Sequence, residues 1–176
     1  MPVAAIELSD WLRGELRSDQ AGETGAVWIY RGVLATRPRP ALRQFCRQHL
    51  ATEQQHLAEM NALLPPQARS VLLPIWRIAG FLTGFLPACL GERPVYLTVA
   101  AVETFVQAHY QQQIMHAELQ RYPDIKETLV ALMQDEIEHK NEATNLAGAP
   151  PGRLAARWCY LVGAGSEIAV KLARRL

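Results

Sequence analysis

The chain has 176 residues, a formal net charge of +1 at pH 7 and hydrophobic residues at 49% of its positions. This length is most simply one domain with a single core, and the small net charge argues against a basic nucleic-acid-binding face. The three cysteines form no Cys-x-x-Cys pair, which disfavours both a disulfide framework and a thiolate zinc site.

Residues 1–15 are expected to form an N-terminal segment outside the domain. They include Glu7, Asp10, Arg13 and Glu15, and they lack the apolar run of a secretory signal. They are also not the arginine-rich, acid-poor sequence of a transit peptide. We therefore expect a bacterial-type chain in which residues 16–176 form one domain.

Helical periodicity dominates the sequence that follows, whereas strand-like alternation is scarce. Prolines and glycines separate the periodic segments, for example at Pro65-Pro66, Pro123 and Gly148. The pattern predicts an all-α protein with six helices. Their expected ranges are 16–35, 41–64, 71–90, 94–121, 124–147 and 153–174.

Acidic residues interrupt the apolar faces of the first two predicted helices. In the first helix, Glu23 lies on a face that comprises Leu16, Val27, Tyr30 and Leu34. In the second helix, Glu53 and His56 occupy places where the pattern calls for apolar residues. That second face comprises Leu42, Cys46, His49, Glu53, His56, Met60 and Leu63. Because no equivalent histidine occurs later in the chain, we interpret His49 as a core residue.

The third predicted helix, 71–90, is the most apolar segment. Its twenty residues carry one charge, at Arg77, and approach the length of a membrane span. Pro74 and Pro87 favour a helix that lies in or against one leaflet over one that crosses the bilayer. The alternative is a helix buried in the protein core.

The second half of the chain repeats the arrangement of the first. Glu103 interrupts an apolar face of the fourth helix, and Glu136 and His139 interrupt one in the fifth. The fifth-helix face comprises Ile125, Leu129, Leu132, Glu136, His139, Ala143 and Leu146. Two helices with a single glutamate and two with Glu-x-x-His form the ligand set of ferritin-like di-metal bundles.

Four carboxylates in one core would repel one another and lose hydration unless positive charge compensates them. No lysine or arginine lies on these faces, whereas two divalent metals would balance the four charges. Oxygen and imidazole ligands without thiolate suit iron or manganese. The alternative is that these acids are exposed on the surface, as most single Glu-x-x-His pairs are. The sequence thus predicts a ferritin-like four-helix bundle with two additional apolar helices.

Several sequence blocks resemble the demethoxyubiquinone hydroxylase family of ubiquinone biosynthesis, from about Asp19 to the C-terminus. The quoted blocks are Ala21-Gly22-Glu23, Glu53-x-x-His56-Leu57, Leu73-Pro74-x-Trp76, Ala101-Val102-Glu103, His109-Tyr110 and Asp135-Glu136-x-Glu138-His139. The resemblance implies a membrane-associated di-iron monooxygenase. It also implies that the six iron ligands are Glu23, Glu53, His56, Glu103, Glu136 and His139.

The resemblance further implies hydroxylation of the ring of demethoxyubiquinone or its quinol, with two iron ions, O2 as co-substrate and an external reductant such as NADH. Tyr110 lies on the face of Glu103 and is a candidate to contact the quinone, with a core tyrosine as the alternative. His109 is a second catalytic candidate, although helix geometry directs it away from that face. Asp19 could accept a hydrogen bond from a ligand imidazole, or act as a structural cap.

Two other functions fit a di-metal bundle: iron or peroxide handling by a ferritin-like protein, and hydroxylation of a tRNA base. The apolar segment 71–90 argues against both, and the small net charge argues against nucleic acid as a partner. The expected partners are a polyprenyl quinone and a membrane surface, with a homodimer or an accessory protein left open. The expected location is peripheral, on the cytoplasmic face of the inner membrane.

Overall fold

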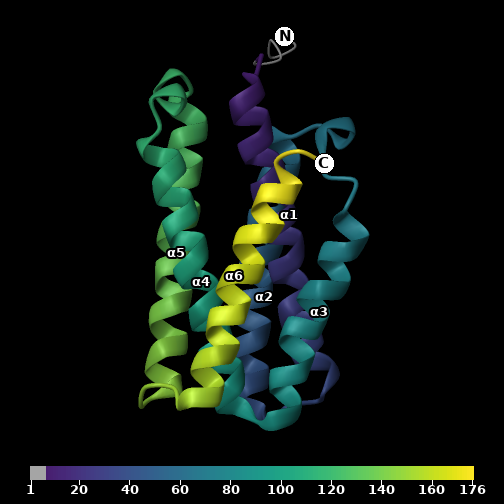
Figure 1. The fold of residues 1–176 in the computed structure, drawn as a ribbon, viewed down its shortest axis with the longest axis vertical. Coiled ribbons are helices and arrows are strands. Elements are labelled where there is room, and N and C mark those ends of the chain that lie inside the picture. The colour runs from purple at the N-terminus through teal and green to yellow at the C-terminus, as the bar shows by residue number, and fades with distance from the viewer. Residues whose placement is uncertain (1–6) are drawn as a thin grey trace.

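A computed structural model describes residues 7–176 as a bundle of long helices with no strand in that range (Figure 1). This confirms the predicted all-α class. The long helices are α1 (Asp10–Ala35), α2 (Pro40–Leu63), α3 (Leu73–Leu90), α4 (Glu92–Met115), α5 (Pro123–Ala147) and α6 (Arg153–Ala173), with 3-10 turns at Pro66–Ala68 and Ala117–Arg121.

Two predicted helix ends were wrong. The first helix begins at Asp10 rather than at residue 16, because Ser9 caps it by accepting a hydrogen bond from the backbone N–H of Leu12. Leu12 and Leu16 are fully buried, so the helical core face extends into the supposed N-terminal segment. The fourth helix ends at Met115, and the chain continues as the 3-10 turn Ala117–Arg121.

Two helical pairs form the bundle: α1 packs on α2, and α4 packs on α5. The predicted inward faces of α2 and α5 are buried from Leu42 to Met60 and from Ile125 to Ala143. At the last turn of α5 the prediction was wrong, because Ala147 is buried and Leu146 is 48% exposed. In α2, Leu63 is partly buried against the core and Leu64 is fully buried. Apolar clusters fill the core on both sides of the acidic residues.

Helix α3 lies outside this bundle and runs in the same direction as α1 (Figure 1). Three glycines allow the two backbones to approach closely: a Cβ at Gly32 would collide with the Phe81 carbonyl, one at Gly80 with Gly25, and one at Gly84 with Ile29. The interpretation of α3 as a buried core helix is wrong, since it leaves Ile75, Ile78, Leu82 and Leu86 between 44% and 63% exposed.

Candidate metal centre

The six residues that the sequence singled out lie together in the middle of the bundle. Each side chain is buried, with no more than 8% of its residue exposed. Glu23 comes from α1, Glu53 and His56 from α2, Glu103 from α4, and Glu136 and His139 from α5. Four helices therefore bring the six side chains together.

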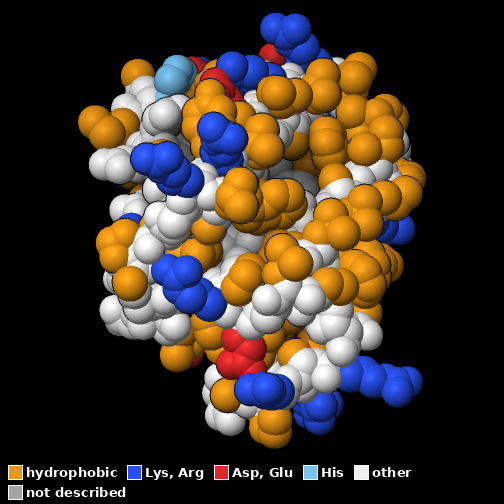
Figure 2. Space-filling view, turned by 60° about the horizontal axis from the view of Figure 1, so that its bottom comes forward, with side chains coloured by type: hydrophobic (Ala, Val, Ile, Leu, Met, Phe, Trp, Pro, Cys, Tyr) orange, Lys and Arg blue, Asp and Glu red, His pale blue; other side chains and the backbone are white. Residues whose placement is uncertain are grey.

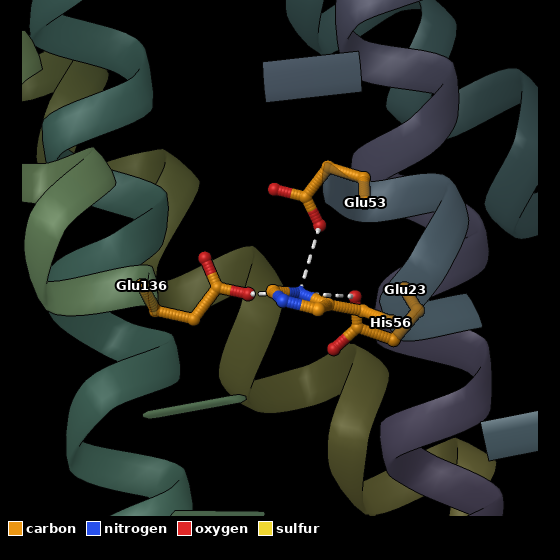
Figure 3. A group of neighbouring side chains, drawn as sticks. All are labelled: Glu23, Glu53, His56 and Glu136. Atoms are coloured by element: carbon orange, nitrogen blue, oxygen red, sulfur yellow. Dashed lines mark hydrogen bonds and ion pairs between the residues drawn. The ribbon is translucent and has the colours of Figure 1, made fainter. Parts of the chain in front are cut away.

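These side chains form two overlapping groups, in each of which one ligand atom per residue lies within 4.8 Å of the others. The first group is Glu23, Glu53, His56 and Glu136, whose side chains point toward one another in Figure 3. The second is Glu53, Glu103, Glu136 and His139. Glu53 and Glu136 belong to both groups, so these two carboxylates are able to serve two adjacent metal ions.

Both imidazoles direct Nδ1 toward the carboxylates. His56 Nδ1 lies 3.0 Å from Glu136 Oε1, and His139 Nδ1 lies 3.1 Å from Glu136 Oε2. On its outer side, His56 Nε2 lies 3.1 Å from Oδ2 of Asp135, which orients the ring. His49 bonds Glu142 at 2.9 Å and lies near the Tyr30 hydroxyl, so it is the satisfied core histidine that we expected.

Burial dominates the protonation of the acidic residues. It raises the pKa of Glu23 to about 7 and raises the pKa values of Glu53 and Glu103 well above 4.5, and the charge of Glu136 adds to each increase. For Glu136 and His56, burial acts against the net shift. Hydrogen bonds from His139 and His56 lower the pKa of Glu136 to about 2. Glu136 and Glu23 raise the pKa of His56 to about 10. In the metal-free protein, protons bound to these glutamates and to His56 therefore offset part of the negative charge of the cluster.

The residues present fit a pair of divalent metal ions. Both carboxylate oxygens of Glu53 and Oε2 of Glu23 are buried and accept no hydrogen bond from residues 7–176. A buried carboxylate oxygen without a partner is costly, and a metal ion removes that cost. The set contains oxygen and nitrogen donors and no thiolate, as iron and manganese prefer. None of the three cysteines belongs to either group.

A second polar cluster lies next to this centre and corrects the role predicted for Asp19. Its carboxylate bonds His109 Nε2 at 2.9 Å and the Gln113 amide at 2.8 Å, not a histidine of the metal groups. Gln113 also donates to Glu15, which accepts a further hydrogen bond from Arg174 near the C-terminus. His109 is buried against α1 because α4 is rotated so that both His109 and Tyr110 face the bundle interior.

Tyr110 links this cluster to the candidate metal centre. Its hydroxyl donates a hydrogen bond to Oε1 of Glu23, and the residue is 1% exposed. Burial, with the charge of Glu23 next, raises the pKa of Tyr110 well above 10, so the phenol keeps its proton. The hydrogen bond holds one oxygen of Glu23 and leaves the other, Oε2, without a hydrogen bond and 3.8 Å from His56 Nδ1.

A cavity of about 330 Å³ connects the carboxylates with the outer helices. Glu23, Glu53, Glu103 and Glu136 line one part, and most of the remaining wall is apolar and comes from α1, α3, α4 and α6. Leu161 on α6 lines the cavity and is 63% exposed, so the cavity extends to the surface. An apolar molecule could therefore reach the acidic centre without crossing a polar wall.

Comparison with known proteins identifies the family. The sequence pattern of the family described as ubiquinone biosynthesis protein COQ7 matches residues 10–173. This chain belongs to the COQ7 family. The resemblance noted in the sequence is thereby confirmed, and the match begins where helix α1 begins.

Curated COQ7-family relatives cover most of the chain. The 3-demethoxyubiquinol 3-hydroxylase of Rhodospirillum rubrum is 35% identical over 167 residues, which are 92% of this chain and 76% of that protein. The NADPH-dependent 3-demethoxyubiquinone 3-hydroxylase of Dictyostelium discoideum, a mitochondrial protein, is 32% identical over 169 residues, again 92% and 76%. The protein of the same name in Rattus norvegicus is 30% identical over 167 residues, which are 91% of this chain and 76% of that protein.

Sequence reasoning missed some polar residues that this COQ7-family structure places beside the centre. Glu15 is 5% exposed, although it was assigned to the N-terminal segment. A usable signal was present, because Glu15, Asp19 and Glu23 recur every four residues and share one helix face. Asp135 is half exposed, and its contact with His56 depends on the separation of α2 and α5, which sequence does not reveal.

Without metal, this COQ7-family protein is expected to become less stable as pH rises from about 5 to about 8. Glu23 has a pKa of about 7 when folded, above its ordinary 4.5, so the folded state binds more protons in this window and stability falls as pH rises through that pKa. Glu53 and Glu103 act in the same direction, and His56 extends the loss toward its pKa of about 10. The lowered pKa of Glu136 acts only on the acid side of 4.5. Burial lowers the pKa of His49 from 6.5 to about 4, which offsets part of the loss below pH 6.5.

Urea unfolding of the metal-free protein at several pH values measures this dependence, and the midpoint should be lower at pH 8 than at pH 5. Metal-loaded protein is the control, because metal binding requires deprotonated ligands and is favoured at the higher pH. A metal-free midpoint that rises with pH would contradict the assigned protonation.

Proposed function

We propose that this chain is an O2-dependent hydroxylase that adds a hydroxyl group to the ring of demethoxyubiquinol or demethoxyubiquinone in ubiquinone biosynthesis. The observation that carries the proposal is the buried cluster of four glutamates and two histidines at one part of an apolar cavity. The substrate class is supported by the names of the relatives in the COQ7 family. They are 3-demethoxyubiquinol and 3-demethoxyubiquinone 3-hydroxylases.

Two iron ions are the proposed metals. The residues that would hold them are Glu23, Glu53, His56, Glu103, Glu136 and His139. Two divalent ions would offset the charge of four ionised glutamates, and the donor atoms suit iron. When bound, the iron pair would supply the reduction of dioxygen that ring hydroxylation requires.

The chain's own residues would bind the ring and exclude water. The apolar wall from α1, α3, α4 and α6 would enclose the ring and keep bulk water from the carboxylates. His109 and Tyr110 also line the cavity. A hydrogen bond with Asp19 fixes His109, and one with Glu23 fixes Tyr110. Fixed side chains beside the ring are suited to orient it and to hold a proton near its oxygens.

The reductant is proposed to come from outside the chain. The mitochondrial relatives are named NADPH-dependent, so NADPH is the first reductant to test and NADH the second. No Gly-x-Gly-x-x-Gly motif occurs in the sequence, which argues against a nicotinamide-binding domain of the Rossmann type.

We also propose that the protein lies on a membrane through α3 and α6. Helix α3 (Leu73–Leu90) is long and apolar enough to cross a bilayer, by length and composition. Leu154, Tyr160, Leu161 and Ile168 on α6 are between 59% and 81% exposed. Hydrophobic side chains gather over much of this face, most densely on the side of α3 (Figure 2). A polyprenyl tail could remain in lipid while its ring enters the cavity.

The protein is expected to sediment with liposomes, and replacing Ile78 with aspartate should reduce the bound fraction about five- to tenfold. The residue is 63% exposed, so the change places a charge in the lipid-facing surface without opening the core. Leu146→Asp is the matched control, since Leu146 is 48% exposed and belongs to α5, which lies across the molecule from α3 (Figure 1). Recovery of the unaltered protein in the supernatant, with or without anionic lipid, would argue against peripheral attachment to the inner membrane.

The proposed reaction is tested with purified, iron-loaded protein, a short-tail demethoxyquinone, NADPH and oxygen. The expected result is hydroxylated quinone by mass spectrometry, in an amount that exceeds the protein and depends on the reductant. Oxidation of added iron or consumption of peroxide without hydroxylated product would instead favour the iron- or peroxide-handling role. Adding a candidate accessory protein, or cross-linking the chain to itself, tests the two remaining partner hypotheses.

A further inference from the structure

Trp76 on α3 has a polar atom that the metal centre does not explain. Its side chain lines the cavity, and its indole Nε1 is buried and donates no hydrogen bond to any group in residues 7–176. The indole N–H is a donor only, and a buried one normally has an acceptor. An unpaired donor at this place lowers stability unless a ligand supplies the acceptor.

Four side chains that line the cavity carry a buried polar atom that makes no hydrogen bond within residues 7–176. They are Asp19, Glu23, Glu53 and Trp76. The three carboxylates are acceptors of hydrogen bonds or ligands of cations, and metal ions would satisfy Glu23 and Glu53. The indole N–H of Trp76 is the donor in this set and cannot coordinate a cation. It requires a neutral or negative oxygen from whatever occupies the cavity.

The packing of α3 on α1 places Trp76 near the metal centre. Gly80 meets Gly25 and Gly84 meets Ile29, so the two helices run side by side in the same direction with a constant offset (Figure 1). Continuing that offset back by one helical turn puts Trp76 level with Ala21, which stands between Asp19 and Glu23. The free donor therefore lies level with the turn of α1 that carries Asp19 and Glu23.

Trp158 on α6 shows what a satisfied indole looks like in the same cavity. It also lines the wall, but its Nε1 donates to Oγ1 of Thr98 at 2.8 Å. The two tryptophans thus present similar apolar surface and differ in whether the N–H is already engaged.

We propose that Trp76 binds the substrate by donating a hydrogen bond from Nε1 to an oxygen on the quinone ring. This inference rests on the proposed function, because it takes the occupant to be an oxygen-bearing aromatic ring. The free Oδ2 of Asp19 is the complementary acceptor for a ring hydroxyl in the quinol form. A donor on α3 and an acceptor on α1 would set which ring edge faces the carboxylates.

The test compares Trp76→Phe with Trp158→Phe in iron-loaded protein without oxygen. Equilibrium dialysis gives the dissociation constants of a short-tail demethoxyquinone and of an alkylbenzene with the same tail and no ring oxygen. Trp76→Phe should weaken binding of the quinone about tenfold relative to the alkylbenzene, the loss typical of one hydrogen bond. Trp158→Phe removes an internal hydrogen bond and should change both constants by the same factor.

An unchanged ratio of the two constants in Trp76→Phe would overturn the proposal. If the unaltered protein hydroxylates the quinone but this ratio is unchanged, the role of Trp76 fails and the function stands. If the ratio changes but no protein hydroxylates the quinone, the function fails and the hydrogen bond stands. Should Trp76→Phe lose its helicity or its iron, benzothienylalanine at position 76 keeps the ring shape and removes only the N–H, and the same ratio decides.

Discussion

Glu136→Ala is expected to leave the protein with almost no bound iron, whereas the unaltered protein should bind about two irons per chain. Glu136 belongs to both groups of candidate ligands and contacts His56 at 3.0 Å and His139 at 3.1 Å. Removing it takes a carboxylate from both candidate positions at once. Elemental analysis after iron loading and desalting measures the result.

Hydroxylation by Glu136→Ala should fall by more than about 100-fold, because losing even a residue that only supports a metal ligand typically costs 10–100-fold. The matched control is Glu138→Ala, which removes an exposed carboxylate from the same helix two residues away. Glu138→Ala should retain both iron and activity. Stoichiometric iron in Glu136→Ala would show that these residues do not hold the metal.

Gly84→Val is expected to lower the free energy of unfolding by about 2–4 kcal/mol. A Cβ at this position would collide with the carbonyl oxygen of Ile29 on α1, and backbone cannot move aside as a flexible side chain does. Helix α3 would have to separate from α1, which would open the wall of the cavity. The loss should therefore appear in urea unfolding and also as weaker binding of the quinone.

Gly163→Ala is the control for that substitution. A Cβ at Gly163 on α6 would meet no atom within 4 Å, so alanine should stabilise the helix by about 0.5–1 kcal/mol. Equal unfolding midpoints for Gly84→Val and the unaltered protein would mean that α3 is not packed against α1 as described.

The inward direction of the candidate ligands could be predicted because helical periodicity is a local property. Glu53 and His56 stand in phase with Leu42 and Met60, and the burial of all four follows from that phase. Convergence of four helices could be predicted only because the ligand pattern matches a known arrangement. The helix ends were less accurate at Asp10, where a serine cap sets the boundary.

Contacts between different helices could not be predicted, since they depend on helix rotation and spacing. His109 was placed away from the site by its angle on α4, yet it is buried against Asp19 because α1 covers that face. Gly80 and Gly84 were visible as small residues in an apolar segment. That they mark a close approach of α3 to α1 follows only from the three-dimensional packing.

The most direct test of the proposed di-iron hydroxylation of a quinone at this centre is mass spectrometry of the product formed under 18O2. Iron-loaded protein with NADPH and a short-tail demethoxyquinone should give a hydroxylated product that carries one 18O atom. Glu138→Ala should give the same labelled product, and Glu136→Ala should give almost none. Unlabelled product, or labelled product from Glu136→Ala at the unaltered rate, would contradict hydroxylation at the metal centre between α1, α2, α4 and α5.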